Sequence, residues 1–164
     1  TYMDITAQAL ACGVTRVATI NAGQNHDHGG QSHIANSSNR SAAPAAYDAV
    51  VRAGQVTGER INYLVNTLSS MPEGNGSVMD NTLIFWVYSL SDGNGHAQDD
   101  ARHVLIGNAG GAFNTGRLLS YPAAQKIEHN HLLTSMINAF GIPDQRFGRE
   151  GWGDGALSEL GVTA

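Results

Sequence analysis

The apolar run TLIFWVYSL, from Thr82 to Leu90, constrains the fold more than any other stretch of the chain. Its β-branched, aromatic and aliphatic side chains favour a strand, and apolar and polar residues do not alternate along it. A strand without alternation is typical of one that is covered on both faces, as in the middle of a parallel sheet. The run therefore predicts a central strand in a mostly parallel sheet.

Helical patterns lie before and after this strand. Pro44 suits the first turn of a long helix, and Gly13 and Gly141 stand where left-handed residues close helices. The predicted helices cover residues 2–12, 44–71 and 132–140, and two further predicted strands cover residues 14–21 and 103–111. Strands separated by helices favour a layered sheet, so the predicted fold class is α/β, a layered α/β/α arrangement with a mostly parallel sheet.

Length and composition predict one domain. The chain has 164 residues, of which 41% are hydrophobic, enough to bury a single core. Residues 1–143 are expected to form this domain, and the glycine-rich residues 144–164 an irregular tail of the same domain. The single cysteine, Cys12, excludes an internal disulfide and a cysteine-based zinc cluster.

Charge and hydropathy narrow the range of partners. The chain has 9 Lys and Arg against 14 Asp and Glu, so it offers no basic face for the phosphate backbone of a nucleic acid. No apolar run approaches the ~18 residues of a membrane span, and we expect a soluble protein that does not span a membrane. The chain begins without methionine, inside a predicted helix, which suggests that it is the later part of something longer.

Two polar loops are the candidates for a functional site. They follow predicted strands that end at Asn21 and Leu90, and ligands of α/β sheets bind at the carboxyl ends of strands. Imidazole and carboxylate groups are ligands of zinc and other transition metals, and Asp92 is the acid at the second strand end. Asp92 can equally cap the following turn, and exposed loop histidines often face solvent. Five of the seven histidines lie in these loops: His26, His28, His33, His96 and His103.

Four stretches of the sequence resemble a known family. They read ACGVTRVATI, LSSMPEGNGSVMDNTLIFWVYSLSDGNGH, HVLIGNAGGAFNTGRLLSYP and NHLLTSMINAFGIPDQRFG. Together with the loop of histidines and serines, they resemble the carboxyl-terminal part of bacterial proteins of unknown function that are named for a His-x-x-Ser-His-His motif. Those proteins are in turn similar to the alkaline phosphatase and sulfatase superfamily. The likeness spans Met3 to Phe147, and its most specific part is the Asp-Asn-Thr-Leu strand followed by Ser-Asp-Gly-Asn-x-His.

The resemblance implies the α/β sandwich of that superfamily, here only its carboxyl-terminal portion, in an exported protein that is periplasmic or extracellular. It also implies a divalent metal, with zinc as a candidate, bound by Asp92, His96 and His103. The further candidate ligands are His26, His28 and His33.

The chain departs from the family motif in the first polar loop. Ser32 and His33 match the motif, whereas His28 lies one residue too far upstream and Ile34 stands where the motif has its last histidine. In the superfamily, the amino-terminal half carries the nucleophile and a metal-binding aspartate. The expected partner is therefore a missing amino-terminal segment or another chain, in a homo- or hetero-assembly.

Three functions are open on this basis. The first is a metal-dependent hydrolase of phosphate or sulfate esters, completed by the missing segment. The second is a non-catalytic extracellular module, structural or for assembly, that kept the fold and lost the site. The third, ranked last, is a module that binds carbohydrate or another small ligand through the same loops.

Overall fold

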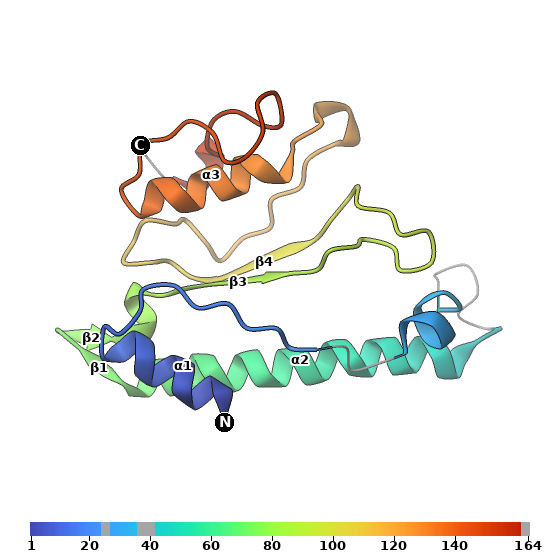
Figure 1. Ribbon diagram of the computed structural model, residues 1–164, viewed down its shortest axis with the longest axis horizontal. Helices are drawn as coiled ribbons and strands as arrows, with labels where there is room; N and C mark the ends of the chain where they lie inside the picture. Colours follow the sequence, from blue (N-terminus) through green and yellow to red (C-terminus); the bar gives the residue numbers. More distant parts are fainter. Residues whose placement is uncertain (24–26, 36–41, 162–164) are drawn as a thin grey trace. The chain divides into compact units, whose positions relative to one another are not determined.

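The computed structural model describes residues 1–23, 27–35 and 42–161 (Figure 1). The chain folds as two compact units. The first comprises Thr1–Val78 and Val87–His103, and the second comprises Met79–Trp86 and Val104–Ala164.

Two helices form most of the first unit. α1 (Tyr2–Ala11) is followed by Gly13, whose φ of 67° is the left-handed conformation that glycine adopts without strain. α2 (Pro44–Ser70) begins at its proline, as predicted, and ends before Pro72 because a proline disfavours helical geometry in the residue that precedes it. α1 lies beside the carboxyl-terminal half of α2 (Figure 1).

Apolar side chains on these two helices are buried, as their helical spacing predicts. They include Met3 and Ala7 of α1 and Leu64 and Leu68 of α2. α2 is 27 residues long, but no helix in the described part of the chain is both long and apolar enough to cross a membrane.

Shorter elements complete the first unit. A π-helical turn, η1 (His28–Ser32), lies beside the amino-terminal half of α2 (Figure 1). After α2, the strands β1 (Pro72–Glu73) and β2 (Gly76–Ser77) pair as an antiparallel hairpin. η1 contains His28, and His33 directly follows it, so an ordered turn holds two histidines of the first polar loop.

The second unit contains helix α3 (His129–Ala139) and most of the strands β3 (Leu83–Val87) and β4 (His103–Gly107), whose residues Val87 and His103 belong to the first unit. Its buried apolar core consists of Phe113, Leu132 and Leu160, against which Leu83, Phe85, Leu105 and Met136 pack. Short 3-10 turns also occur at η2 (Val78–Asn81), η3 (Ala123–Gln125) and η4 (Ser158–Leu160).

Polar side chains of α3 hold the carboxyl-terminal tail. Thr134, Ser135 and Asn138 are all buried on this helix, and each bonds to the backbone of the tail. These bonds join Thr134 to Phe147, Ser135 to Leu157, and Asn138 to both Ile142 and Asp144, over 2.8–3.1 Å. Hydroxyl and amide groups therefore fix a segment that has little regular secondary structure.

The predicted layered α/β/α fold is wrong, and with it the α/β sandwich that the family resemblance implies. In the described residues the strands form two separate two-stranded antiparallel sheets, and residues 14–21 contain no strand. Within the described ranges, β3 pairs with β4 and with no other strand, so it is not a central strand there. Leu83 and Phe85 pack against the core, whereas Val87 is exposed. The connection formed by residues 88–102 contains no helix, and parallel strands are usually joined through one.

Candidate metal centre

Three histidines of the first unit, His28, His33 and His96, come together in space, and we call them the histidine group. One ring nitrogen from each lies within 4.8 Å of the others. The Nε2 atoms of His28 and His96 are 3.1 Å apart, and the ring centroids are separated by 4.9–5.2 Å. His96 follows His28 by 68 residues. The fold therefore gathers imidazole groups from two distant segments at one point.

The π-helical geometry of η1 places His28 and His33 on the same side. The His33 N–H donates to the His28 carbonyl oxygen over 3.2 Å, which is the i→i+5 bond of a π turn. In an α-helix, with 3.6 residues per turn, side chains five positions apart point in very different directions. The Asp27 N–H donates to the Gln31 Oε1 over 2.9 Å and closes the start of the turn. The two rings consequently meet edge to face, with an interplanar angle of 70°.

A tight loop, residues 91–97, presents His96. Asp92 and Ala97 form an isolated antiparallel bridge that closes this loop. The carboxylate of Asp92 accepts hydrogen bonds from the N–H groups of Asn94, at 3.1 Å, and Gly95, at 3.0 Å. His96 has a φ of 54°, in the left-handed region that is uncommon for residues with a side chain. Asp92 thus fixes the turn from which His96 projects.

The separation of the ring nitrogens fits an ion of the zinc type. With Zn–N distances of 2.0–2.1 Å, tetrahedral ligands lie about 3.3–3.4 Å from one another. The 3.1 Å between His28 and His96 is close to this value, and the other pairs lie within 4.8 Å. His28 and His33 are half-buried and His96 is exposed, so one side of the group is open to water.

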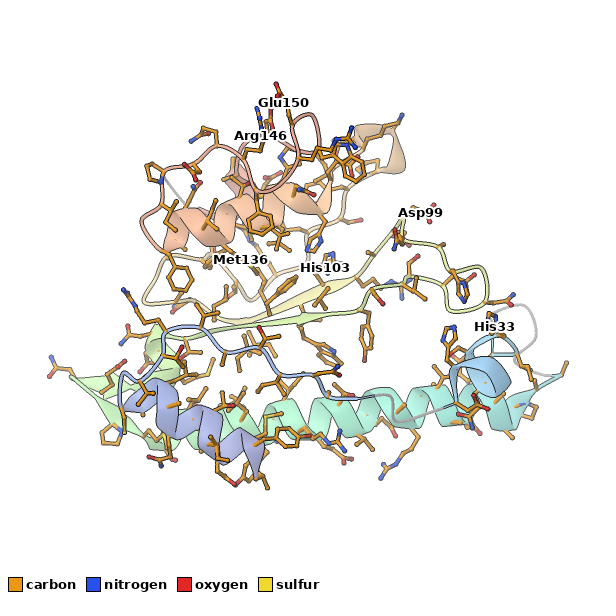
Figure 2. All side chains as sticks on the ribbon, in the orientation of Figure 1. His33, Asp99, His103, Met136, Arg146 and Glu150 are labelled. Atoms are coloured by element: carbon orange, nitrogen blue, oxygen red, sulfur yellow. The ribbon has the colours of Figure 1, made fainter. Side chains whose placement is uncertain are left out.

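The other predicted ligands lie outside this group among the described residues. Asp92 is exposed, and both of its carboxylate oxygens cap its own turn. His103 is half-buried on β4, and Figure 2 labels it together with His33, which directly follows η1. His26 lies outside the residues that the structure describes. Of the set Asp92, His96 and His103, the structure brings only His96 into the histidine group.

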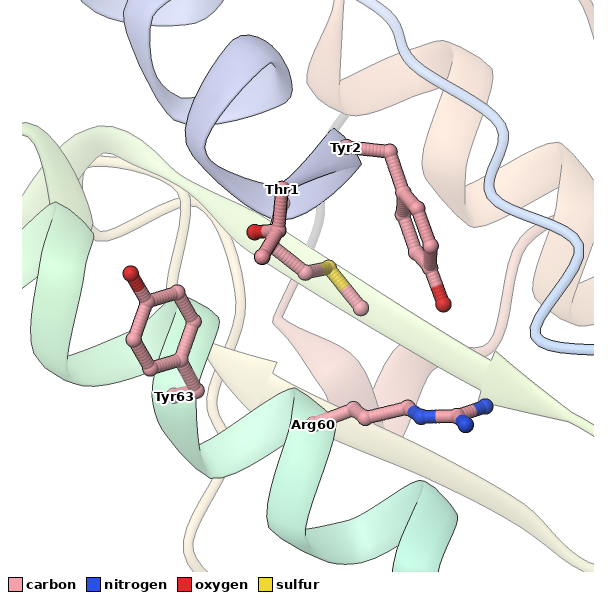
Figure 3. Close-up of a pocket in the computed structure, with 5 residues that line it drawn as sticks. Thr1, Tyr2, Arg60 and Tyr63 are labelled. Atoms are coloured by element: carbon pink, nitrogen blue, oxygen red, sulfur yellow. The ribbon is translucent and has the colours of Figure 1, made fainter.

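The first unit also has an apolar cavity of about 210 Å³ (Figure 3). The Arg60 guanidinium donates to the carbonyl oxygen of Ala22 over 2.9 Å. The Tyr63 hydroxyl donates to the Asp4 carboxylate, and this bond raises the pKa of Tyr63. The lining residues are Thr1, Tyr2, Met3, Arg60 and Tyr63. Among the described residues, this lining includes no histidine, cysteine or carboxylate, so the cavity is not the candidate for a metal site that the histidine group is.

Comparisons with protein-family models, with curated proteins and with solved structures find no match to this chain. The resemblance to the His-x-x-Ser-His-His proteins therefore stays a prediction that depends on the quoted motifs. In the part of the chain that the structure describes, the histidine group is the candidate for a functional site.

Proposed function

We propose that the chain binds a divalent transition-metal ion through His28, His33 and His96, and that this ion is the centre of its function. The supporting observation is that three imidazole nitrogens lie within 4.8 Å of one another. Three neutral imidazoles are the ligand set of one class of catalytic zinc sites, which keep a fourth position for water or substrate. Zinc is therefore the ion that this ligand set fits best.

A hydrogen bond between two histidines does not account for the whole group. His28 and His96 can share one proton across the 3.1 Å between their Nε2 atoms, with one ring donating and the other accepting. The ring of His33 also stands 4.9 Å from each of these rings. Holding three side chains in place costs conformational freedom, and a single hydrogen bond contributes only about 1 kcal/mol. A shared cation offsets that cost because each nitrogen gains a coordinate bond.

We infer that the reaction class is hydrolysis of phosphate or sulfate esters by an exported protein. The motif resemblance supports this class, and the exposure of His96 leaves the ion accessible to a substrate. When bound, such an ion polarises an ester oxygen and lowers the pKa of a bound water. The residues of the chain hold and orient it: His28 and His33 from the π turn, and His96 from the loop that Asp92 caps.

A structural ion is the second candidate function. Its ligands come from segments 68 residues apart, so the ion would cross-link η1 to the loop of residues 91–97. An ion that needs the folded arrangement of its ligands stabilises that arrangement by its own binding energy. The chain would then be a non-catalytic extracellular module in which the ion orders a surface loop for assembly.

Titration of the metal-free chain with Zn²⁺, followed by calorimetry, tests the binding. We expect one ion per chain, and Co²⁺ in the same site to show the visible absorption of tetrahedral nitrogen coordination. Binding of less than about half an equivalent of Zn²⁺ would contradict both candidates, because a functional site is filled in the folded chain.

Hydrolysis assays with p-nitrophenyl phosphate and p-nitrophenyl sulfate separate the two candidates. Turnover by the Zn²⁺-loaded chain that disappears in the His96→Ala variant supports the hydrolase. A higher melting temperature with Zn²⁺ and no turnover, by this chain alone or combined with an amino-terminal segment that supplies the nucleophile, supports the structural ion, because an ion that binds only the folded state raises its stability.

A further inference from the structure

Gly93 and Ser32 touch where the loop of residues 91–97 meets η1. A Cβ atom added to Gly93 would lie 2.9 Å from the Cβ of Ser32 and 3.5 Å from its Oγ. Ser32 is only 7% exposed, and its Cβ is attached directly to the backbone of η1. Rotation of the Ser32 side chain therefore cannot relieve this contact.

The contact lies next to all three members of the histidine group in the chain. Ser32 directly precedes His33 and follows His28 by four residues, and Gly93 precedes His96 by three. We propose that Gly93 is a positioning residue of the metal centre. Its lack of a side chain lets the loop approach η1 closely enough for His96 to reach the two histidines there. The inference rests on the proposed metal binding, because Gly93 supplies no ligand itself.

The displacement that a side chain would cause is large for a metal site. Ordinary Cβ contacts begin near 3.4 Å, so relieving the 2.9 Å contact separates the two segments by about 0.5 Å. Metal–ligand distances hold within about 0.2 Å, and working sites within about 0.5 Å. The φ of Gly93 is outside the left-handed range, so alanine fits the backbone there. Any effect of alanine then reports the spacing of the two segments.

Zn²⁺ and Co²⁺ binding to the whole chain and its variants tests the proposal. We expect Gly93→Ala to weaken Zn²⁺ binding by about 10-fold or more and to change the Co²⁺ absorption spectrum, while the far-ultraviolet circular dichroism stays the same. The double variant Ser32→Gly with Gly93→Ala removes the opposing Cβ. It should regain the Zn²⁺ affinity of Ser32→Gly alone to within about threefold, because the two segments can approach again.

Gly29→Ala is the matched control, because Gly29 is a glycine that supplies no ligand and makes no close approach to another segment. A Cβ there would meet only the Asp27 Oδ1, at an ordinary 3.7 Å. This variant should bind Zn²⁺ within about twofold of the unchanged chain, because neither segment has to move.

Each outcome decides the proposal. Unchanged Zn²⁺ affinity in Gly93→Ala, or weakened affinity that the double variant does not restore, would overturn it while leaving the metal site intact. If Gly93→Ala does not fold, the double variant decides. A double variant that folds and binds Zn²⁺ again supports the proposal, and one that does not fold or does not bind overturns it. An unchanged chain that binds no Zn²⁺ would overturn both this inference and the proposed function.

Discussion

Both units of the molecule contain histidines, but their surroundings differ. In the first unit His28, His33 and His96 contact one another, and one of the three is exposed. In the second unit the Nδ1 of His131 lies 2.9 Å from the carbonyl oxygen of Gly155, so this ring holds the tail against α3. One set of rings is directed toward a shared point, whereas His131 is used as a structural hydrogen-bonding group.

His129, also on α3, extends the contrast. Its ring packs against Phe85 with centroids 5.8 Å apart, and burial lowers the pKa of the imidazole. Apolar surroundings favour the neutral ring and leave it as a packing residue. A histidine therefore becomes a candidate ligand through the groups around it, not through its place in a polar stretch of sequence.

Removing one member of the histidine group tests the difference between the two units most directly. We expect His33→Ala to weaken Zn²⁺ binding by more than about 100-fold, because it deletes a ligand. Substitutions of residues that only support a ligand already lower metal affinity 10–100-fold. Calorimetric titration of the folded variant measures the loss. An affinity within about threefold of the unchanged chain would show that His33 is not a ligand.

His131→Ala is the control from the second unit. It should leave Zn²⁺ binding unchanged, because its partner is the backbone of the tail. Equal losses in the two variants would mean that the histidines of the two units do not differ in role.

Substituting a polar side chain of α3 is expected to have the next largest effect, on the stability of the second unit. Asn138 is 6% exposed and donates to the carbonyl oxygens of Ile142 and Asp144 over 2.8 and 2.9 Å. Asn138→Ala should lower the free energy of unfolding by about 2 kcal/mol, because two hydrogen bonds of about 1 kcal/mol each are lost. Both tryptophans, Trp86 and Trp152, belong to the second unit, so their fluorescence during urea unfolding reports on it.

Asn66→Ala, at an exposed position of α2, is the control for this measurement. It should leave the tryptophan transition in place. A transition for Asn138→Ala at the same urea concentration as the unchanged chain would show that the tail does not depend on these bonds.

Substitution of Asp92, in the first unit, is expected to have a smaller effect on Zn²⁺ affinity. Because it acts on His96 through the turn, Asp92→Ala should weaken Zn²⁺ binding by about 10-fold. Asp92→Asn should cost less than about threefold, since asparagine forms the same side-chain turn. If Asp92 were a ligand, both variants would lose affinity alike. Asp99→Ala, on the same exposed connection (Figure 2), should change nothing.

The sequence predicts the helices better than the sheets. The ends of α1, α2 and α3 carry local signals, and Gly13, Pro44 and Gly141 lie where these signals placed them. Strand pairing has no such signal: an apolar run does not reveal its partner, and β3 has only one. No helix is predicted in residues 88–102, and this already indicates antiparallel strands, because a connection without a helix favours them.

The sequence also predicts the chemistry of the candidate site better than its geometry. Imidazole is a common metal ligand, so every member of the histidine group is a candidate from sequence. Their grouping depends on the π turn, because a spacing of five residues is out of phase with both α-helix and strand. The role of Asp92 was open between cap and ligand, and its bonds to Asn94 and Gly95 show the cap.

The smallest expected effect is the pH dependence of the second unit. Because burial lowers the pKa of His129 below its ordinary 6.5, the unfolded chain takes up its proton first as the pH falls. Protonation stabilises the unfolded state and so lowers the free energy of unfolding. The contribution of His129 to stability is therefore present above about pH 6.5 and is lost progressively below it. Unfolding followed by tryptophan fluorescence should show a shallower loss of stability below pH 6.5 in His129→Gln than in the unchanged chain. If the stability of both proteins fell in parallel as the pH decreased, the apolar contact with Phe85 would not set the charge of this ring. His131 would then be the one histidine on which the contrast between the two units depends.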